Sequence, residues 1–520
     1  MVDDAAAFTT LSPADLEFLA TLAERRPITA GDYLYRTGDP TTHFFVVLRG
    51  SVELLADADG AEVVLGVARP GNFTGELNLL TGMRMMASAR VVESGEVLAV
   101  PRRELQHIMA TRPLLGDTIL ATFMARRVAG LQGSGIGTAI RVIGSRFSPE
   151  SRRVREFLAR NRIPHEWLEP ERDAAVDAVL REFRVDALDL PVVIAMGTVL
   201  RSPTPGTLAQ HLGLTVDSLP ERCFDVVVVG SGPAGLAAAV YGASEGLRTL
   251  TLDMTAVGGQ AGGSSRIENY LGFPTGISGG DLMARALVQA EKFGAHLASP
   301  CAADSLSEQA GHLVIALSDG TEVGARAVVA ATGARYRRLT AARLDDFEGN
   351  GVYYAATDLE ARMCAGGPVV VVGGGNSAGQ AALFLAESGS AVTVAIRRDT
   401  LEATMSRYLV ERVEADPRIS VRPNTEVVAL DGDETLTAAQ LSGSGADEWS
   451  KCCGLFSFIG AEPAADWLSG CAAVDDRGFV LTDRAIDPGQ LDGRWTAMGR
   501  SPLPFETSFP GLFAVGDLRS

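Results

Sequence analysis

The sequence predicts a multidomain α/β protein with a β-rich first part, a small α/β second part and a longer third part built from βαβ units. A chain of 520 residues is too long for one ordinary domain core. Two continuous apolar runs, residues 224–229 and 369–372, each lead directly into a glycine-rich turn. The domains that we predict are 1–129, 138–214, 224–350 with 462–520, and 351–461.

Composition and charge narrow the class of protein. With 46% hydrophobic residues and 57 glycines, the chain is typical of a globular, glycine-rich α/β protein. A formal net charge of −18 argues against a surface that binds nucleic acid, because phosphate contacts need clustered Lys and Arg. The first residues lack the order of a signal peptide, and no apolar stretch is long enough to span a bilayer. We therefore expect a cytoplasmic protein that binds neither nucleic acid nor membrane.

The first two parts differ in their periodicity. Short apolar stretches alternate with turn glycines, as in residues 44–55 with Gly50 at a corner, and this patterning predicts an antiparallel β-roll closed by a helix over 114–129. A glycine-rich linker follows over 130–137. The second part then alternates strand, helix, strand, helix, strand, in the segments 140–143, 151–161, 165–168, 173–183 and 192–195.

The first glycine-rich turn has the pattern of a dinucleotide site. Its first glycine, Gly230, permits a tight turn, Gly232 lets backbone N–H groups approach a pyrophosphate, and Gly235 lets the next helix pack against the strand. Pro233 and Ala234 complete the turn and begin an Ala-rich helix whose N-terminus favours phosphate. Asp253 follows the next strand, at the spacing expected for an acid that accepts a hydrogen bond from a ribose 2′-OH.

The second glycine-rich turn contains Gly373, Gly375, Asn376 and Ser377, with Ala378 at the third small position. The strand that follows ends in a pair of basic residues instead of an acid. Guanidinium groups bind a 2′-phosphate through charge-assisted hydrogen bonds, which favours NADPH over NADH. The alternative is that the pair only solvates a loop. Two dinucleotide sites in one chain imply bound FAD and exchanging NADPH. The basic pair is Arg397 and Arg398.

From residue 224 onward the sequence resembles the low-molecular-weight thioredoxin reductases. The residues that carry the resemblance are 258–260, 267–272, 331–333 and 506–517. It implies two Rossmann-like domains, an FAD domain split around an inserted NADPH domain, in a homodimer whose domains rotate. It also implies flavin contacts, including one from an Asp to the ribityl chain, by Gly259, Gln260, Asn269 and Asp517.

The redox dithiol of that family is absent. Where the family has Cys-Ala-Thr-Cys, this sequence has Ala355-Ala356-Thr357-Asp358, and the acidic residue that follows is Leu359. We therefore expect no catalytic thiol at Ala355 or Asp358. Electrons would pass from NADPH through FAD to another acceptor: a small redox protein, a quinone or dioxygen. The alternative is a non-catalytic regulator that binds ligands, although the intact glycine turns favour the enzyme.

Two other departures from the family affect cofactor binding. The arginine that follows the basic pair in the family is Glu402 here, which would weaken 2′-phosphate binding. The sequence ends just past the closing flavin motif, where the family continues with a helix whose N-terminus faces the flavin. We therefore expect either a fragment or a shortened protein that holds FAD weakly.

The first part resembles a cyclic-nucleotide-binding domain. Gly75, Glu76 and Leu77 match its phosphate cassette, whose Glu accepts from the ribose 2′-OH. The positions of the phosphate-binding Arg hold Met85 and Met86, and Arg84 comes slightly early. Burying a phosphate without a cation is unfavourable. We expect a degenerate sensor, and nucleotide binding through Arg84 is the alternative.

The second part resembles a glutaredoxin or thioredoxin fold, in which a C-P-Y-C motif begins the first helix. Ser148 and Ser151 stand there instead, and residues 189–193 match the cis-proline turn beside it. A hydroxyl cannot replace a thiolate. We expect a structural spacer or a docking module.

The chain contains six cysteines, and none of them forms C-x-x-C or has metal-ligand spacing. We therefore expect no metal site. Cys452 and Cys453 begin an apolar run and are interpreted as small core residues, whereas Cys364 is a weak redox candidate.

Overall fold

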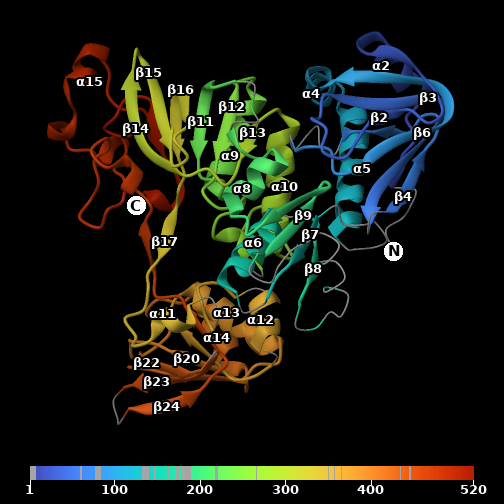
Figure 1. The fold of residues 1–520 in the computed structure, drawn as a ribbon. Helices are drawn as coiled ribbons and strands as arrows, with labels where there is room; N and C mark the ends of the chain where they lie inside the picture. Colours follow the sequence, from blue (N-terminus) through green and yellow to red (C-terminus); the bar gives the residue numbers. More distant parts are fainter. Residues whose placement is uncertain are drawn as a thin grey trace. The chain divides into compact units, whose positions relative to one another are not determined.

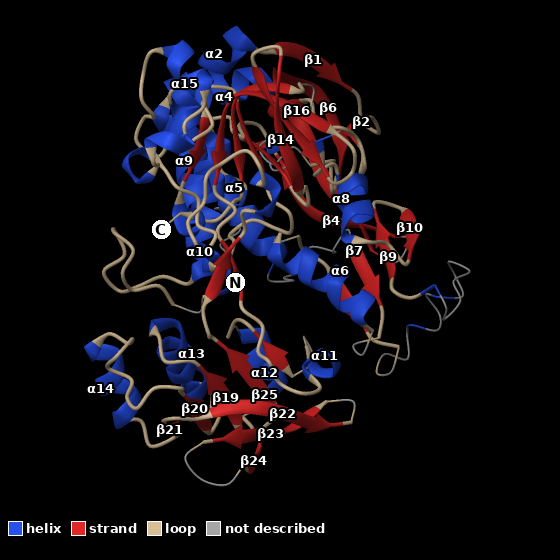
Figure 2. Ribbon diagram, turned by 90° about the vertical axis from the view of Figure 1, so that its left-hand side faces the viewer, coloured by secondary structure: helices blue, strands red, loops and turns tan. Residues whose placement is uncertain are grey.

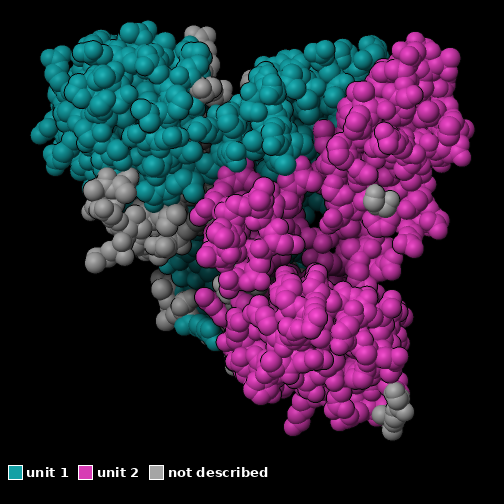
Figure 3. Space-filling model, turned by 180° about the vertical axis from the view of Figure 1, so that it is seen from behind, with its two compact units in different colours: residues 1–229, 236–257, 287–328 teal, residues 230–235, 258–286, 329–520 magenta. Residues whose placement is uncertain are grey.

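The structure is a computed structural model that forms two compact units (Figures 1 and 3). The first unit comprises Met1–Val229, Leu236–Val257 and Leu287–Val328, and the second comprises Gly230–Gly235, Gly258–Ala286 and Val329–Ser520. The structure describes the chain except residues 1–6, 59–60, 77–82, 132–139, 146–147, 162, 171, 173–175, 177–179, 181–188, 217–218, 220, 265, 349–350, 357, 365, 434, 444–446 and 520.

The first unit begins with the predicted antiparallel β-roll. Its six-stranded sheet has the order β1-β6-β3-β4, with β2 paired to β6 and β5 paired to β3. Among the described residues these strands pair antiparallel, as the short apolar stretches separated by turn glycines predict. The strands are β1 (Glu24–Ile28), β2 (Tyr33–Tyr35), β3 (His43–Ala58), β4 (Ala61–Ala68), β5 (Phe73–Thr74) and β6 (Ser88–Pro101).

Helices α2 (Pro13–Leu22), α4 (Arg102–Thr111) and α5 (Pro113–Leu131) accompany the roll. They share its core of fully buried aromatic and aliphatic side chains, which includes Phe44 and Phe123. The helix that we predict over 114–129 is therefore confirmed.

A four-stranded sheet of order β10-β9-β7-β8 follows in the same unit. β7 pairs parallel with β8 and antiparallel with β9. β10 and α8 were not predicted, and the expected helix over 173–183 lies mostly outside the described residues. The elements are β7 (Ile140–Ile143), α6 (Pro149–Arg160), β8 (Glu166–Leu168), β9 (Val192–Ala195), β10 (Thr198–Arg201) and α8 (Pro205–Leu212).

The third sheet of the chain has the order β13-β12-β11-β16-β15-β14. β11, β12 and β13 are parallel, whereas β14, β15 and β16 form an antiparallel meander. The elements are β11 (Cys223–Val229), α9 (Pro233–Ser244), β12 (Thr249–Leu252), α10 (Gly279–Lys292), β13 (His296–Ala298), β14 (Ala303–Gln309), β15 (His312–Leu317) and β16 (Glu322–Ala330).

The second unit contains a parallel sheet of order β18-β25-β19-β20-β21, with α13 and α14 packed beside it (Figure 2). An antiparallel sheet β22-β23-β24 and the ribbon β17-β26 lie in the same unit. The elements are β17 (Ala334–Tyr336), α11 (Leu344–Phe347), β18 (Val352–Tyr353), α12 (Asp358–Cys364), β19 (Val369–Val372), α13 (Asn376–Glu387), β20 (Val392–Ala395), α14 (Arg407–Ala415), β21 (Ile419–Arg422), β22 (Glu426–Gly432), β23 (Leu436–Ser442), β24 (Glu448–Lys451), β25 (Gly454–Ser457), β26 (Ala461–Pro463), α15 (Gly493–Met498) and β27 (Leu512–Ala514).

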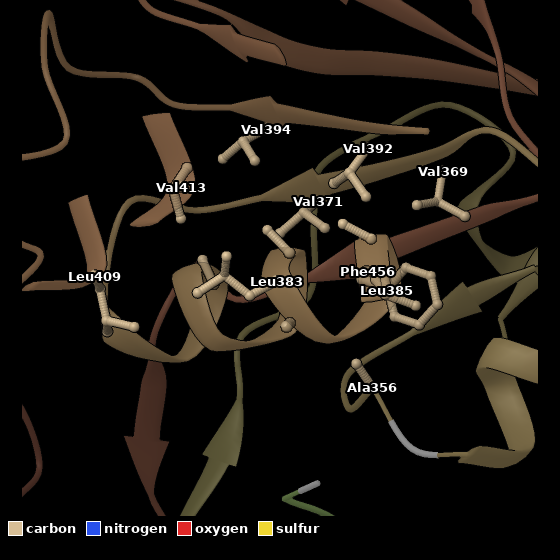
Figure 4. Close-up of a cluster of buried hydrophobic side chains, with 14 of the residues drawn as sticks. Ala356, Val369, Val371, Leu383, Leu385, Val392, Val394, Leu409, Val413 and Phe456 are labelled. Carbon is tan, nitrogen blue, oxygen red and sulfur yellow. The ribbon is translucent and has the colours of Figure 1, made fainter. Parts of the chain in front are cut away.

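The central strand β19 explains why its sequence is a continuous apolar run. Val369 and Val371 face one buried cluster, with Phe456 of β25, and Figure 4 shows this cluster between the strands and α13. Val370 and Val372 face a second buried cluster on the other side of the sheet. Because successive side chains point to opposite faces, a strand covered on both faces must be apolar at every position. The predicted α/β fold class is therefore confirmed.

Two features are absent from the described residues. None of the helices that they form combines the length and apolar character required to cross a membrane. Within the same residues, no group of three His, Cys, Asp or Glu side chains is placed to hold a metal ion.

Candidate functional site

The first glycine turn, in the second unit, shows a separate physical role for each glycine. At Gly230, where φ is +108°, an added Cβ would lie 2.2 Å from the Ala331 carbonyl oxygen. At Gly235 it would lie 1.9 Å from the Gly230 carbonyl oxygen. At Gly232 it would meet nothing within 4 Å. The first and third glycines are therefore required by packing, whereas the second leaves an open cradle in which a pyrophosphate fits.

Two other segments of the second unit meet this turn. The Gly258 N–H donates to the Ser231 carbonyl at 3.0 Å, and an added Cβ at Gly259 would lie 3.1 Å from the Gly232 Cα. An added Cβ at Gly516 would lie 3.0 Å from the Ala234 Cβ. The structure thus brings the predicted flavin loop, and the turn Gly516–Leu518 that contains the exposed Asp517, to the first glycine turn.

The other predicted flavin residues lie in different surroundings. The side-chain amide of Gln260 donates to the Ala334 carbonyl at the start of β17. Asn269 is exposed, two residues after the isolated bridge between Ile267 and Ile277. Gln260 is therefore anchored to the protein itself, whereas the side chain of Asn269 is exposed.

Asp253 follows β12 in the first unit. Its Oδ1 accepts from the Thr255 N–H at 2.9 Å and from the Ala256 N–H at 3.0 Å. The residue is only 9% exposed. These two backbone bonds fix the direction of the carboxylate at the end of a parallel strand, where an acid that binds ribose is expected.

The closing motif is held by a buried ion pair that the sequence did not reveal. Glu506 is fully buried and accepts from Arg500 at 2.6 and 2.9 Å. It also accepts from the Leu503 N–H at 2.7 Å and the Gly511 N–H at 2.9 Å. Burial raises the pKa of Glu506, but Arg500 and the two backbone N–H groups outweigh it, so the pKa is lowered. A buried acid usually has a cation nearby, but the burial of Glu506 is known only from the fold, so the sequence does not point to Arg500.

The second glycine turn has the same arrangement of a crowded first glycine and an open second one. Gly373 has φ of +135°, and an added Cβ would lie 2.3 Å from the Phe458 carbonyl oxygen. At Gly375, the N-cap of α13, an added Cβ would meet nothing within 4 Å. Asn376 accepts from the Ser406 N–H at 2.7 Å, and Ser377 is exposed at the first turn of the helix. This turn too leaves open space at a helix N-terminus, where a phosphate fits.

Arg397 and Arg398 lie at the same edge of the sheet as this turn. Val372 pairs in parallel with Ala395, so the residues that follow β19 and β20 leave the sheet side by side. Both arginines are exposed, and the Arg397 Nε lies 3.9 Å from Glu426 Oε1. An ion pair this long and exposed is weak.

The positions that correspond to the dithiol lie at the start of α12. Ala355 is half-buried, and Ala356 belongs to the core cluster of Figure 4. The helix begins at Asp358. The thiol on α12 belongs to Cys364, at the opposite end of the helix, and a helix of 7 residues is about 10 Å long.

In the β-roll, Glu76 is occupied by a protein partner. It is fully buried, and its Oε1 accepts from Arg126 Nη1 of α5 at 2.6 Å. Within the described part of the chain, its Oε2 has no hydrogen-bond partner. Gly75 precedes it with φ of +91°, Leu77 lies outside the described residues, and Arg84 donates to the Gly38 carbonyl at 3.2 Å.

The two serines of the second part lie at the start of α6. Ser148 is the N-cap of α6 and accepts from the Ser151 N–H at 3.2 Å. Ser151 is buried, and an added Cβ at Gly144 would lie 2.4 Å from its Oγ and 3.2 Å from the Pro191 Cβ. The expected cis peptide is present between Leu190 and Pro191. The helix N-terminus and the proline turn therefore meet.

Comparison with known proteins gives two family matches in this chain. Residues 224–520 match the family model described as pyridine nucleotide-disulphide oxidoreductase. Residues 25–112 match the model described as cyclic nucleotide-binding domain.

Individual relatives agree with the longer match. The chain is similar to the thioredoxin reductase of Streptomyces clavuligerus, with 33% identity over 297 residues that cover 56% of this chain and 85% of the relative. It is 34% identical over 303 residues to that of Mycolicibacterium smegmatis, covering 58% of this chain and 90% of the relative. Among solved structures, the thioredoxin reductase of Lactococcus lactis (FR conformation) is similar with a TM-score of 0.50 and 27% identity, covering 57% of this chain and 91% of that one.

Proposed function

We propose that this chain passes electrons to an acceptor other than an internal dithiol. The chain belongs to the pyridine nucleotide-disulphide oxidoreductase family and is an FAD- and NADPH-dependent oxidoreductase. The predicted resemblance to thioredoxin reductases, fused to a cyclic-nucleotide-binding domain, is confirmed by the matches. The observation that carries the proposal is the start of α12, where Ala355 and Asp358 stand in place of two thiols. A carboxylate and a methyl group cannot exchange with a disulfide.

The chain's own residues supply binding and orientation. When bound, NADPH and FAD supply hydride and electron transfer. The backbone N–H groups of the turn at Gly232 and of the turn at Gly375 would each hold a pyrophosphate at a helix N-terminus. Asp253 would accept from the ribose of FAD, and Asp517 would contact its ribityl chain. In this proposal Gln260, tied to the Ala334 carbonyl, fixes the position of the flavin loop.

The acceptor would be a small redox protein, a quinone or dioxygen. Each of these can take electrons directly from a reduced cofactor, without a thiol relay. We also propose that the enzyme is a homodimer in the cytoplasm, and that the second part of the chain is a docking module or a spacer.

The acceptor is tested by comparing two oxidants under anaerobic conditions. We expect NADPH to bleach the flavin absorbance of the purified chain, and ferricyanide to restore it with steady turnover. A thioredoxin-type disulfide should give less than about a hundredth of that rate, because the dithiol step is missing. A Cys364→Ser, Cys453→Ser double variant is the control for thiols elsewhere in the chain. Disulfide reduction that survives in this variant contradicts the proposal, and absence of bleaching favours the non-catalytic regulator.

We propose that the N-terminal domain is a degenerate sensor. The support for this is the ion pair between Glu76 and Arg126. The Arg126 Nε also donates to the Ala7 carbonyl at 2.7 Å, and its Nη2 donates to the Phe73 carbonyl at 3.0 Å. A ribose hydroxyl that bound to Glu76 would have to displace Arg126 from this ion pair, in which the Arg126 side chain is only 12% exposed. Removing one partner of such a pair costs about 3–5 kcal/mol.

Nucleotide preference tests the role of the two arginines. Replacing Arg397 and Arg398 with alanine should raise the KM for NADPH by about tenfold or more, because a charge-assisted contact to the 2′-phosphate is lost. The KM for NADH should stay within about twofold. Steady-state kinetics with both cofactors measures this. Arg418→Ala is the matched control, since Arg418 pairs with Asp416 at the start of β21, the opposite end of the sheet. Equal effects on both cofactors contradict the assignment.

A further inference from the structure

Two cysteines that are far apart in the sequence lie together in the second unit. Cys364 is the last residue of α12, and Cys453 immediately precedes β25. The Cys453 thiol is 3.4 Å from the Cys364 carbonyl oxygen and 3.3 Å from the Pro368 carbonyl oxygen. The two side chains are therefore close enough for each thiol to affect the pKa of the other. The fold, and no local motif, therefore creates a vicinal pair of thiols.

Glycines make room for both sulfur atoms. An added Cβ at Gly454 would lie 2.6 Å from the Cys364 Sγ, and one at Gly367 would lie 2.8 Å from the Cys453 Sγ. Either side chain would force a thiol out of its place. Both cysteines are free.

The two thiols differ in exposure and in acidity. Cys364 is buried at 4% exposure, whereas Cys453 is half-buried. The hydrogen bond from Cys364 lowers the pKa of Cys453 to about 7, although burial opposes it. The same interaction, followed by burial, raises the pKa of Cys364. Because Cys453 is the more exposed of the two thiols, it is the member that reacts first with peroxide.

We propose that Cys453 and Cys364 form an oxidant-sensitive pair that closes to a disulfide on reaction with hydrogen peroxide. The Cys453 thiolate attacks one oxygen of the peroxide, the O–O bond breaks, and with one proton taken up the products are a sulfenic acid and water. The Cys364 thiol then attacks the Cys453 sulfur, forming the S–S bond and releasing a second water. In total, two thiols and one hydrogen peroxide give one disulfide and two waters.

The pair is separate from the dinucleotide site. In the parallel ladder of β19 and β25, Val369 pairs with Gly454 and Val372 pairs with Ser457. The glycine turn at Gly373 follows the far end of this ladder, so Cys453 lies about 10–13 Å along the strands from the nucleotide edge. Oxidation would instead tie the C-terminal end of α12 to the start of β25.

The test uses the full chain without NADPH, so its outcome does not depend on the proposed function. Protein reduced with dithiothreitol and desalted is exposed to a few equivalents of hydrogen peroxide. Remaining thiols are alkylated, and tryptic peptides are read by mass spectrometry without reduction. We expect two of the six thiols to escape alkylation. The peptides of residues 363–397 and 452–477 should appear as one cross-linked species that is two hydrogens lighter than their sum.

Variants identify the sulfur atoms. Cys453→Ser and Cys364→Ala should each abolish the cross-link. Cys452→Ser and Cys471→Ser should keep it, because Cys452 is buried and burial raises its pKa to about 12. Fragmentation of the wild-type cross-linked species gives the same assignment without any variant. A link through Cys452 or Cys471, or a Cys453 oxidised to sulfinic acid while Cys364 is still alkylated, overturns the proposal.

Discussion

Gly232→Val is expected to yield a folded chain that does not retain FAD. The structure leaves nothing within 4 Å of the position of a Cβ at Gly232, so the substitution should not disturb the turn itself. The same space is where backbone N–H groups meet a pyrophosphate, and an isopropyl group would keep it out. FAD content after desalting should fall to about a tenth of the wild-type value or less, which corresponds to a loss of at least about 1.4 kcal/mol in binding.

The flavin absorbance and the thermal unfolding midpoint, measured together, check this result. Gly375→Val is the matched control, because a Cβ there also meets nothing within 4 Å but belongs to the second turn. That variant should keep its FAD and lose bleaching by NADPH. A Gly232→Val protein that remains yellow, or loss of flavin from both variants, would refute the separate assignment of the two turns.

These two turns could be predicted because their geometry is local. An apolar run that is buried on both faces, followed by glycines at fixed spacing, specifies strand, turn and helix within about thirty residues. The sequence therefore indicated the turns at Gly230 and Gly373, but not the carbonyl groups of Ala331 and Phe458 that crowd them. The β-roll was equally accessible, since short apolar stretches separated by turn glycines predict strands such as β3, whose side chains over residues 44–47 are buried on both faces.

Partners that are distant in the chain could not be predicted in this way. Arg126 lies 50 residues from Glu76, and Cys453 lies 89 residues from Cys364. No periodicity links such positions, because each contact depends on how a whole sheet brings helix and strand together. The cysteines were accordingly interpreted as core residues and as one weak redox candidate, and only the fold places two of them side by side. What the sequence missed is thus tertiary pairing of polar side chains.

Glu506→Ala is expected to destabilise the second unit by about 3–5 kcal/mol, because it leaves the Arg500 guanidinium and two backbone N–H groups without their shared acceptor. Chemical unfolding monitored by tryptophan fluorescence measures the effect, since Trp495 is buried beside Arg500. Glu411→Ala is the control. Its ion pair with Arg407 has side chains that are 64% and 92% exposed, and such pairs contribute no more than about 0.5 kcal/mol. Similar losses in the two variants would contradict the role given to Glu506.

Measuring the free energy of unfolding as a function of acidic pH distinguishes the contribution of the Glu506 charge from that of its side-chain size. The pKa of Glu506 is lowered in the folded state from an ordinary value of 4.5, so its contribution to stability is fully present above that value and is lost as pH falls through the folded pKa. Glu506→Gln removes this titration while keeping the size of the side chain. The free energy of unfolding of the variant should therefore fall less steeply with acid than that of the wild type. If the two curves stay parallel below the ordinary value, the carboxylate is not held in its charged form by Arg500, and the closing motif is stabilised by packing alone.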